Sequence, residues 1–163
     1  MDRTLSKMYT FEELHNGAIE QIPKVSGVYF VIIPKDFCLR IKEKTDGFEM
    51  TSKGTPSSYP IKRLNPKIEH YGMNYPYKSN ILYIGKAKDL QRRIEQYVGY
   101  RYKDPNLFPH DGGRALWQLE NNEKLLVRYL VCKEEEDCRE MENQLLCTYK
   151  TKYGAYPFAN WKM

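Results

Sequence analysis

One carboxylate of this sequence, Glu142, stands where the surrounding pattern predicts an apolar side chain. Apolar residues recur around it at the spacing of one helix face, and they are Cys138, Met141, Leu145, Leu146 and Tyr149. A carboxylate on the core-facing side of a helix is unfavourable unless a cation or a hydrogen-bond donor meets it. Glu142 is therefore either a candidate partner for a cation or an edge residue that reaches solvent, and these residues alone leave both open.

The elements that must position Glu142 follow from local patterns. The acidic cluster at 134–137 favours the start of a helix, which is predicted to run to Lys150 and to carry Glu142. A capping-box pattern at 10–13 opens a short helix that Gly17 can close. Apolar runs at 28–33, 81–84 and 125–132 predict strands. Helices are predicted over 89–97 and after Gly112-Gly113, so the order of elements indicates a small α/β or α+β domain.

The segment between the first two strands is basic and rich in tyrosine. Alternation on both sides of Asp46-Gly47 predicts a β-hairpin over 38–53, with Arg40, Lys42 and Lys44 on one face. Residues 54–80 contain many Pro, Ser, Tyr and Lys residues and are predicted to form a long loop. Residues 35–103 carry 15 basic and 7 acidic side chains. This imbalance is typical either of a surface that binds a polyanion or of a solvated charged face.

Two short motifs stand on the first two predicted strands, Gly27-Val28-Tyr29 and Tyr83-Ile84-Gly85. With the residues up to Ile94, they resemble the paired signature of the GIY-YIG nuclease superfamily, especially its nucleotide-excision-repair members. Glu142-Asn143-Gln144-Leu145-Leu146 is similar to the glutamate helix of this family, and Pro157-Phe158-Ala159-Asn160 to its terminal Pro-x-x-Asn element.

The resemblance implies a divalent-metal-dependent endonuclease that hydrolyses phosphodiester bonds of DNA. It assigns Tyr29 as the general base, Arg93 to the scissile phosphate and Glu142 to one Mg²⁺ (or Mn²⁺) ion. A single carboxylate with several waters is a common way to hold Mg²⁺, and arginine can bond two phosphate oxygens at once. The other catalytic assignments are Tyr83, Lys86, Tyr97 and Asn160.

Two of these assignments carry a physical condition. Arg93, and not the adjacent Arg92, matches the family's helix arginine, and it lies four residues before Tyr97 on the same helix face. Tyr29 can act as a base only if a neighbouring charge lowers its pKa from the usual value of about 10.

Residues 34–79 are not covered by the resemblance and are interpreted as an insertion within a single domain, 1–163. We expect this insertion to grip the substrate, because a two-stranded ribbon fits a major groove and basic side chains bind phosphates. The predicted DNA-binding residues are Arg40, Lys42, Lys44, Lys62, Arg63, Lys88 and Arg114. Target choice would then come from the insertion, from a second copy of the chain in a homodimer, or from a partner protein.

The composition excludes several other classes of protein. The longest apolar run, at 28–33, is far shorter than the ~20 residues of a membrane-spanning helix. The first residues carry no apolar stretch typical of a secretory signal, so a cytoplasmic protein is expected. The four cysteines lack C-x-x-C spacing and are interpreted as reduced, buried thiols.

The expected fold is therefore α/β (α+β), with a central three-stranded antiparallel sheet flanked by helices and an inserted hairpin and loop. Three alternatives for function stay open at this stage. The chain could be a DNA endonuclease of restriction, repair or mobile elements, an RNA-directed nuclease with the same site, or a non-catalytic nucleic-acid-binding module of the same fold.

Overall fold

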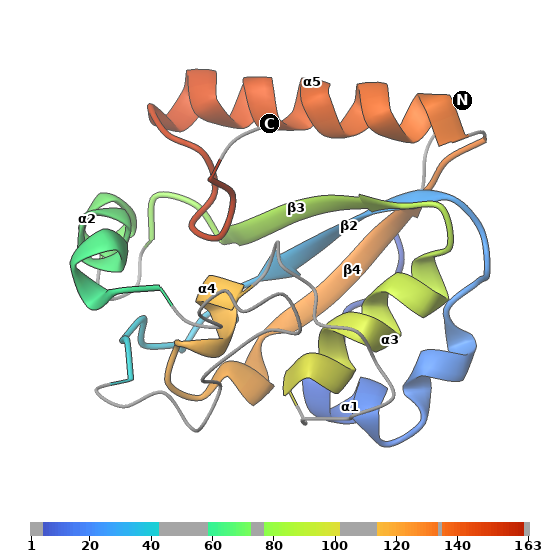
Figure 1. Cartoon of the computed structure of the whole chain (residues 1–163), viewed down its shortest axis with the longest axis horizontal. Helices are drawn as coiled ribbons and strands as arrows, with labels where there is room; N and C mark the ends of the chain where they lie inside the picture. The colour runs from blue at the N-terminus through green and yellow to red at the C-terminus, as the bar shows by residue number, and fades with distance from the viewer. Residues whose placement is uncertain (1–4, 43–58, 73–76, 102–113, 134, 162–163) are drawn as a thin grey trace.

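The computed structural model describes residues 5–42, 59–72, 77–101, 114–133 and 135–161 of the chain. A four-stranded antiparallel sheet lies at its centre, in the order β1-β4-β2-β3. The strands are β1 (Tyr9–Thr10), β2 (Gly27–Ile32), β3 (Ile81–Ala87) and β4 (Leu126–Val131). Helix α5 (Glu135–Tyr153) lies along one face of the sheet, and α1 (Phe11–His15) and α3 (Leu90–Arg101) lie on the other face (Figure 1).

The remaining elements gather towards the end of the sheet at which β3 begins. They are the helices α2 (Ile61–Tyr71) and α4 (Arg114–Trp117), and residues 154–161 fold back from the end of α5 to the same region (Figure 1). Two 3₁₀ turns, η1 (Ala18–Gln21) and η3 (Asn122–Lys124), connect other elements. Among the described residues, no helix is both long and apolar enough to cross a membrane.

Strand β2 is the centre of the core, because all six of its residues are buried and it pairs with both β3 and β4. Its first residue has to be glycine. A Cβ on Gly27 would lie 2.4 Å from the carbonyl oxygen of Leu130 and 2.4 Å from Cδ1 of Leu90, the first residue of α3. The absence of a side chain at Gly27 therefore lets α3 begin in close contact with the sheet.

Most of the predicted elements are confirmed. Thr10 caps α1 with the full capping box, since its hydroxyl accepts from the Glu13 N–H and the Glu13 carboxylate accepts from the Thr10 N–H. At the start of α3, Asp89 Oδ1 accepts from the Arg92 N–H. The strands over 28–33, 81–84 and 125–132 and the long last helix are also present.

Two predictions of the fold are wrong in detail. The sheet has four strands instead of three, because the two-residue β1 pairs with β4; a strand this short leaves no alternation to read. Residues 61–71, expected within a long loop, form α2, which buries Leu64, Ile68 and Tyr71 along one face despite Pro66 in its interior. Most of the predicted hairpin over 38–53, including the Asp46-Gly47 turn, lies outside the described residues and stays a prediction; in its described part, Ile41 forms an isolated antiparallel bridge with Leu119.

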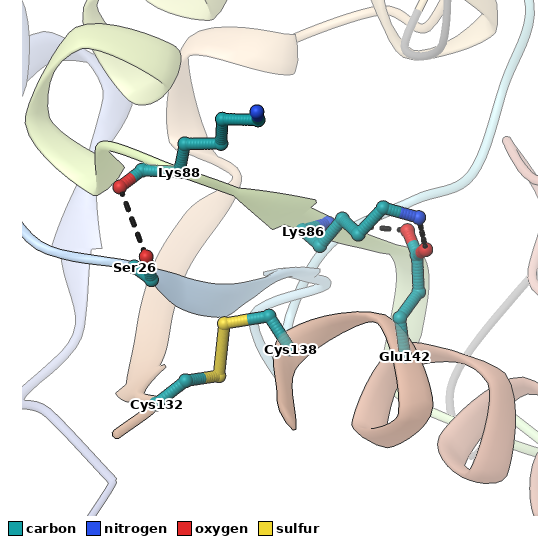
Figure 2. Close-up of a disulfide and its surroundings, with 6 residues drawn as sticks. All are labelled: Ser26, Lys86, Lys88, Cys132, Cys138 and Glu142. Carbon is teal, nitrogen blue, oxygen red and sulfur yellow. Dashed lines mark hydrogen bonds and ion pairs between the residues drawn. A yellow bond between two sulfur atoms is a disulfide. The ribbon is translucent and has the colours of Figure 1, made fainter. Parts of the chain in front are cut away.

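The interpretation of all four cysteines as reduced thiols is also corrected. Cys132, just after β4, and Cys138, in the first turns of α5, form a disulfide, and both residues are buried (Figure 2). The sequence pattern missed it because the two cysteines are six positions apart and only the turn between β4 and α5 brings them together. Cys38 and Cys147 take no part in a disulfide. The disulfide therefore ties the start of the helix that carries Glu142 to the end of a central strand.

Candidate active site

Three of the predicted tyrosines form one cluster on the face of the sheet that α3 covers. The ring centroids lie 5.8 Å apart for Tyr29 and Tyr83, 6.1 Å apart for Tyr29 and Tyr97, and 6.0 Å apart for Tyr83 and Tyr97. Tyr29 lies on β2 opposite Gly85, and Tyr83 lies two residues before Gly85 on β3, so the two side chains are diagonal neighbours on one face. All three rings are buried, so these tyrosines form part of the core as well as the site.

Gly85, the last residue of the second motif, leaves room for the two signature tyrosines. A Cβ at this position would lie 2.7 Å from Cε1 of Tyr83 and 2.9 Å from both Cζ and the hydroxyl oxygen of Tyr29. The phenol of Tyr29 therefore lies directly over the backbone of Gly85, in space that any other residue would fill. The glycine is what allows the two signature tyrosines to bring their hydroxyl groups together.

Arg93 reaches this cluster from α3, whereas Arg92 does not. Arg93 is half-buried and hydrogen-bonds the Tyr29 hydroxyl, while Arg92 is exposed. The difference follows from helix geometry, because one residue of offset turns a side chain by about 100°. The structure thus places Arg93 on the same side of α3 as Tyr97, as the four-residue spacing predicts.

Burial dominates the acid–base properties of the cluster. Removal from water raises the pKa of Tyr29 well above its usual value, and the nearby Tyr83 adds to this, while the charge of Arg93 acts in the opposite direction. Burial likewise raises the pKa of Tyr83 to about 12, with the Tyr29 hydrogen bond and Arg93 lowering it and the Glu142 charge raising it. Both phenols are therefore protonated at neutral pH in the free protein.

The Glu142 carboxylate forms an ion pair with Lys86, so of the two alternatives left open by its apolar neighbours, the structure shows a cation partner. One carboxylate oxygen lies 2.6 Å from Nζ of Lys86, and the other accepts a 3.1 Å hydrogen bond from the Lys86 backbone N–H (Figure 2). The Glu142 side chain is 16% exposed and that of Lys86 43% exposed, so the pair lies at the surface of the site. Because Glu142 also acts on the pKa of Tyr83, the carboxylate lies within electrostatic reach of the tyrosine cluster.

Asn160 lies on the open edge of β3. Its side chain pairs with Ile84, accepting from the Ile84 N–H at 3.0 Å and donating to the Ile84 carbonyl at 2.9 Å. The neighbouring Ala159 N–H donates to the Leu82 carbonyl at 2.8 Å. With the Glu142 bond to Lys86, these contacts satisfy backbone groups that an edge strand would otherwise leave unpaired. Asn160 and Glu142 thus hold the same strand, which carries Tyr83 and Gly85.

Helix α2 of the predicted insertion supports this arrangement. Nζ of Lys67 donates to the carbonyl oxygens of Phe158 and Asn160, each at 2.8 Å, and more weakly to that of Pro157 at 3.5 Å. Tyr71, also on α2, accepts a 3.2 Å hydrogen bond from the Phe158 N–H. Helix α2 of the insertion therefore fixes the C-terminal segment 157–160, which in turn hydrogen-bonds the edge of β3.

Tyr59, in the basic, tyrosine-rich part of the insertion, lies close to the cluster although no catalytic role is predicted for it. The side chain of the buried Gln118 accepts from the Tyr59 N–H and donates to the Tyr59 carbonyl, each at 2.7 Å. The Tyr59 ring lies 4.6 Å from that of Trp161, and it is close enough to Tyr83 to act on that residue's pKa. No local pattern marks Tyr59, because the contact depends on how α2 and the C-terminal segment pack.

The structure separates the predicted DNA-binding residues into two groups. Arg63 and Arg114 lie beside Tyr59, with guanidinium carbons 5.5 Å and 5.0 Å from its ring centroid, and are thus near the site. Arg40, Lys62 and Lys88 are exposed and Lys42 is half-buried. Lys44 lies outside the described residues.

The donor set suits a hard divalent ion at one carboxylate. In the described part of the chain, no three His, Cys, Asp or Glu side chains gather as they would in a zinc centre. Glu142 presents a partly exposed carboxylate, and Mg²⁺ is commonly held by one or two carboxylates with waters completing its shell. The residues present therefore fit such an ion, with Lys86 as the competing partner of the carboxylate.

An arginine and a cluster of phenols on one face of the sheet, with a partly exposed carboxylate at the β3 edge, are groups that a hydrolase can use to act on phosphodiesters. Comparison with known proteins identifies the family. Residues 73–154, half of the chain, match the family model of the GIY-YIG catalytic domain. The chain belongs to the GIY-YIG family and carries its endonuclease domain, which confirms the prediction from the tyrosine motifs.

Individual relatives agree with this assignment. The chain is similar to the UvrABC system protein C of Wolinella succinogenes, with 31% identity over 53% of this chain, and to that of Bacteroides fragilis, with 33% identity over 63% of this chain. Each alignment covers 14% of the relative, so the chain corresponds to a small part of those proteins. No solved structure matches the chain.

Proposed function

We propose that this protein is a divalent-metal-dependent endonuclease that cleaves DNA. The observation that carries the proposal is that Arg93 hydrogen-bonds the Tyr29 hydroxyl of the tyrosine cluster, while Glu142 bonds Lys86 on β3, three residues after Tyr83 of the same cluster. A phosphodiester placed over Tyr83 would thus lie between a guanidinium and a carboxylate able to hold a metal ion. The similarity to UvrABC system protein C favours a role in DNA repair over one in restriction or mobile elements.

In the proposed reaction, each residue of the chain has a distinct role. Arg93 binds non-bridging oxygens of the scissile phosphate and neutralises the charge that develops there. Glu142 and its waters hold the ion, which would supply Lewis-acid stabilisation of the leaving oxygen. Lys86 keeps the Glu142 carboxylate in place through its N–H and its ammonium group.

Tyr29 is the proposed general base, and its surroundings define what that role requires. Burial keeps the pKa of Tyr29 high, so it holds its proton in the free protein. Arg93 lowers the pKa of the same phenol by charge and by hydrogen bonding. Deprotonation of Tyr29 would therefore depend on positive charge in the assembled site, with Tyr83 and Tyr97 fixing the ring.

Incubation of supercoiled plasmid with the purified protein tests the proposal. Nicked or linear product should appear with Mg²⁺ or Mn²⁺ and disappear with a chelator. A structured RNA of the same length distinguishes the RNA-directed alternative. Tight DNA binding without cleavage under every metal condition would instead identify a non-catalytic binding module of this fold.

The insertion is proposed as a DNA-gripping element. Arg40 and Lys42 lie in the described part of it, and Lys44 follows. Each basic side chain on a duplex phosphate adds about 0.9 to the slope of log affinity against log salt. Replacing all three by alanine should flatten this slope by two to three units.

A triple variant with the same loss of charge is the matched control. Lys24, Lys124 and Lys152 are exposed and lie outside the insertion. If both triple variants lower the slope equally, the insertion contributes only net charge and the grip is not located there. A second copy of the chain or a partner protein would then remain as the source of target choice.

A further inference from the structure

A hollow of about 370 Å³ lies outside the tyrosine cluster, between α2, the end of α5 and the C-terminal segment. In Figure 1 these three elements lie around the end of the sheet at which β3 begins. The side chains that line it include Lys67, His70, Lys150, Tyr156 and Trp161. Its volume lies within the roughly 300–1,000 Å³ typical of sites for small molecules.

The lining is positively charged. The ammonium group of Lys67 is half-buried and bonds only backbone carbonyl oxygens, with no carboxylate beside it among the described residues. Burial lowers the pKa of Lys67 to about 8, which reflects the missing counter-charge. Lys150, on the last turns of α5, is exposed, and its Nζ lies 4.7 Å from the centroid of the Tyr156 ring. An anionic ligand would provide the charge that the protein does not.

The lining also offers polar atoms without partners. Nε2 of His70 and Nε1 of Trp161 are both buried and form no hydrogen bond within the described part of the chain. Such atoms lose free energy on leaving water unless a ligand or an ordered water bonds them. Two of them in residues that line one hollow indicate a site that takes a polar ligand.

We propose that this hollow binds one nucleotide, with the phosphate on Lys150 and His70 and the base beside Tyr156 and Trp161. Aromatic rings next to cationic side chains are the combination that recognises an unstacked base together with its phosphate. The nucleotide has two sources, a free mononucleotide or a nucleotide extruded from a strand, and the second source rests on the proposed function.

Two residues that line the hollow, Asn160 and Trp161, also contact residues at or near the active site. The Trp161 ring lies 4.6 Å from that of Tyr59 in a tilted arrangement, Tyr59 lies near Tyr83, and the adjacent Asn160 is bonded to Ile84. Lys150 lies eight residues after Glu142 on α5, or about 12 Å along the helix axis at 1.5 Å per residue. That distance is within the reach of two neighbouring nucleotides, so a strand in the hollow can continue to the scissile position.

Calorimetric titration without divalent metal tests the site, because no cleavage can occur. The ligands are a deoxynucleoside monophosphate, the same deoxynucleoside without phosphate, inorganic phosphate, and a short single-stranded oligonucleotide. The monophosphate should bind more tightly than either of its halves. Lys150→Ala should weaken binding about tenfold, the effect of one hydrogen bond to a charged group. Ala155→Phe, which narrows the hollow, should weaken it further.

Lys152→Ala is the matched control, since Lys152 is also exposed on the last turn of α5 and does not line the hollow. If Lys150→Ala weakens binding of the mononucleotide, the hollow is a site for free nucleotides. If it weakens binding of the oligonucleotide alone, the hollow is a site for a nucleotide within a strand. The proposal is overturned if Lys150→Ala and Lys152→Ala weaken every ligand equally, or if no ligand binds. Plasmid cleavage by the unmodified protein is scored separately, so failure of this site leaves the nuclease proposal intact, and the converse also holds.

Discussion

Glu142→Gln is the substitution that best separates the catalytic role of this residue from its structural role. Glutamine has nearly the same shape as glutamate and keeps a carbonyl oxygen, which can still accept the Lys86 N–H that Oε1 now accepts at 3.1 Å. It removes the negative charge that lies 2.6 Å from the Lys86 ammonium. The variant thus retains the contact with the edge of β3 and loses the charge that a metal ion requires.

The two roles predict losses of very different size. The Lys86 side chain is 43% exposed, and ion pairs in contact with water contribute about 0–1 kcal/mol, so the free energy of unfolding should fall by no more than about 1 kcal/mol. Loss of metal-assisted stabilisation removes several kcal/mol from the transition state. Cleavage should therefore fall by more than about a thousandfold, which corresponds to about 4 kcal/mol.

The assay combines plasmid cleavage at fixed Mg²⁺ with denaturant unfolding of the same preparations. Glu140→Gln is the control, because Glu140 is exposed two residues earlier on α5 and accepts a hydrogen bond from Gln144. It should leave both quantities nearly unchanged. Near-normal turnover in Glu142→Gln would refute the metal assignment, and a stability loss of several kcal/mol would show that the Lys86 contact is the main role of this carboxylate.

Three further predictions follow from the same structure. Arg93→Ala should lower cleavage at least about a hundredfold, as expected for loss of a donor to the developing charge, whereas Arg92→Ala should change it little; the reverse ranking would show that the helix register of the site is wrong. Burial raises the pKa of Tyr83 to about 12 while the unfolded residue titrates near ~10, so the folded state keeps a proton that the unfolded state loses. Its contribution to stability is then complete below about pH 10 and declines as the pH rises towards 12, which denaturant unfolding at several alkaline pH values measures. Finally, because Cys132 and Cys138 form a disulfide, a thiol titration should find two thiols in protein denatured without reductant and four after reduction. Loss of the disulfide should lower the free energy of unfolding by about 2 kcal/mol, since the loop that it closes is short. Four thiols without reductant would contradict the pairing.

The sequence by itself determined the elements whose patterns are local. The apolar run at 28–33 and the capping box at Thr10 need only near neighbours to be recognised, and the strand and the cap that they predict are present in the structure. The same holds for the four-residue spacing that puts Arg93 and Tyr97 on one face of α3. The glycines of the two motifs also belong here, although only the packed structure shows which atoms would clash at Gly85.

Helix α2 and strand β1, which were not predicted, have weak or conflicting local sequence signals. Helix α2 contains Pro66 and follows Pro60, so its composition indicates a loop, yet the burial of Leu64, Ile68 and Tyr71 against the rest of the chain stabilises it. Strand β1 has two residues and exists because β4 offers it an edge. In both cases tertiary packing, not local preference, decides the secondary structure.

The tertiary structure alone decided how the site is held. Asn160 bonds Ile84 across 76 positions of sequence, and Lys67 bonds the Asn160 carbonyl across 93. Tyr59 approaches Tyr83 because Gln118 clamps its backbone. Contacts between residues so far apart leave no periodic trace in the chain, since they form only when the edge of β3 has to be covered and every buried polar group has to find a partner.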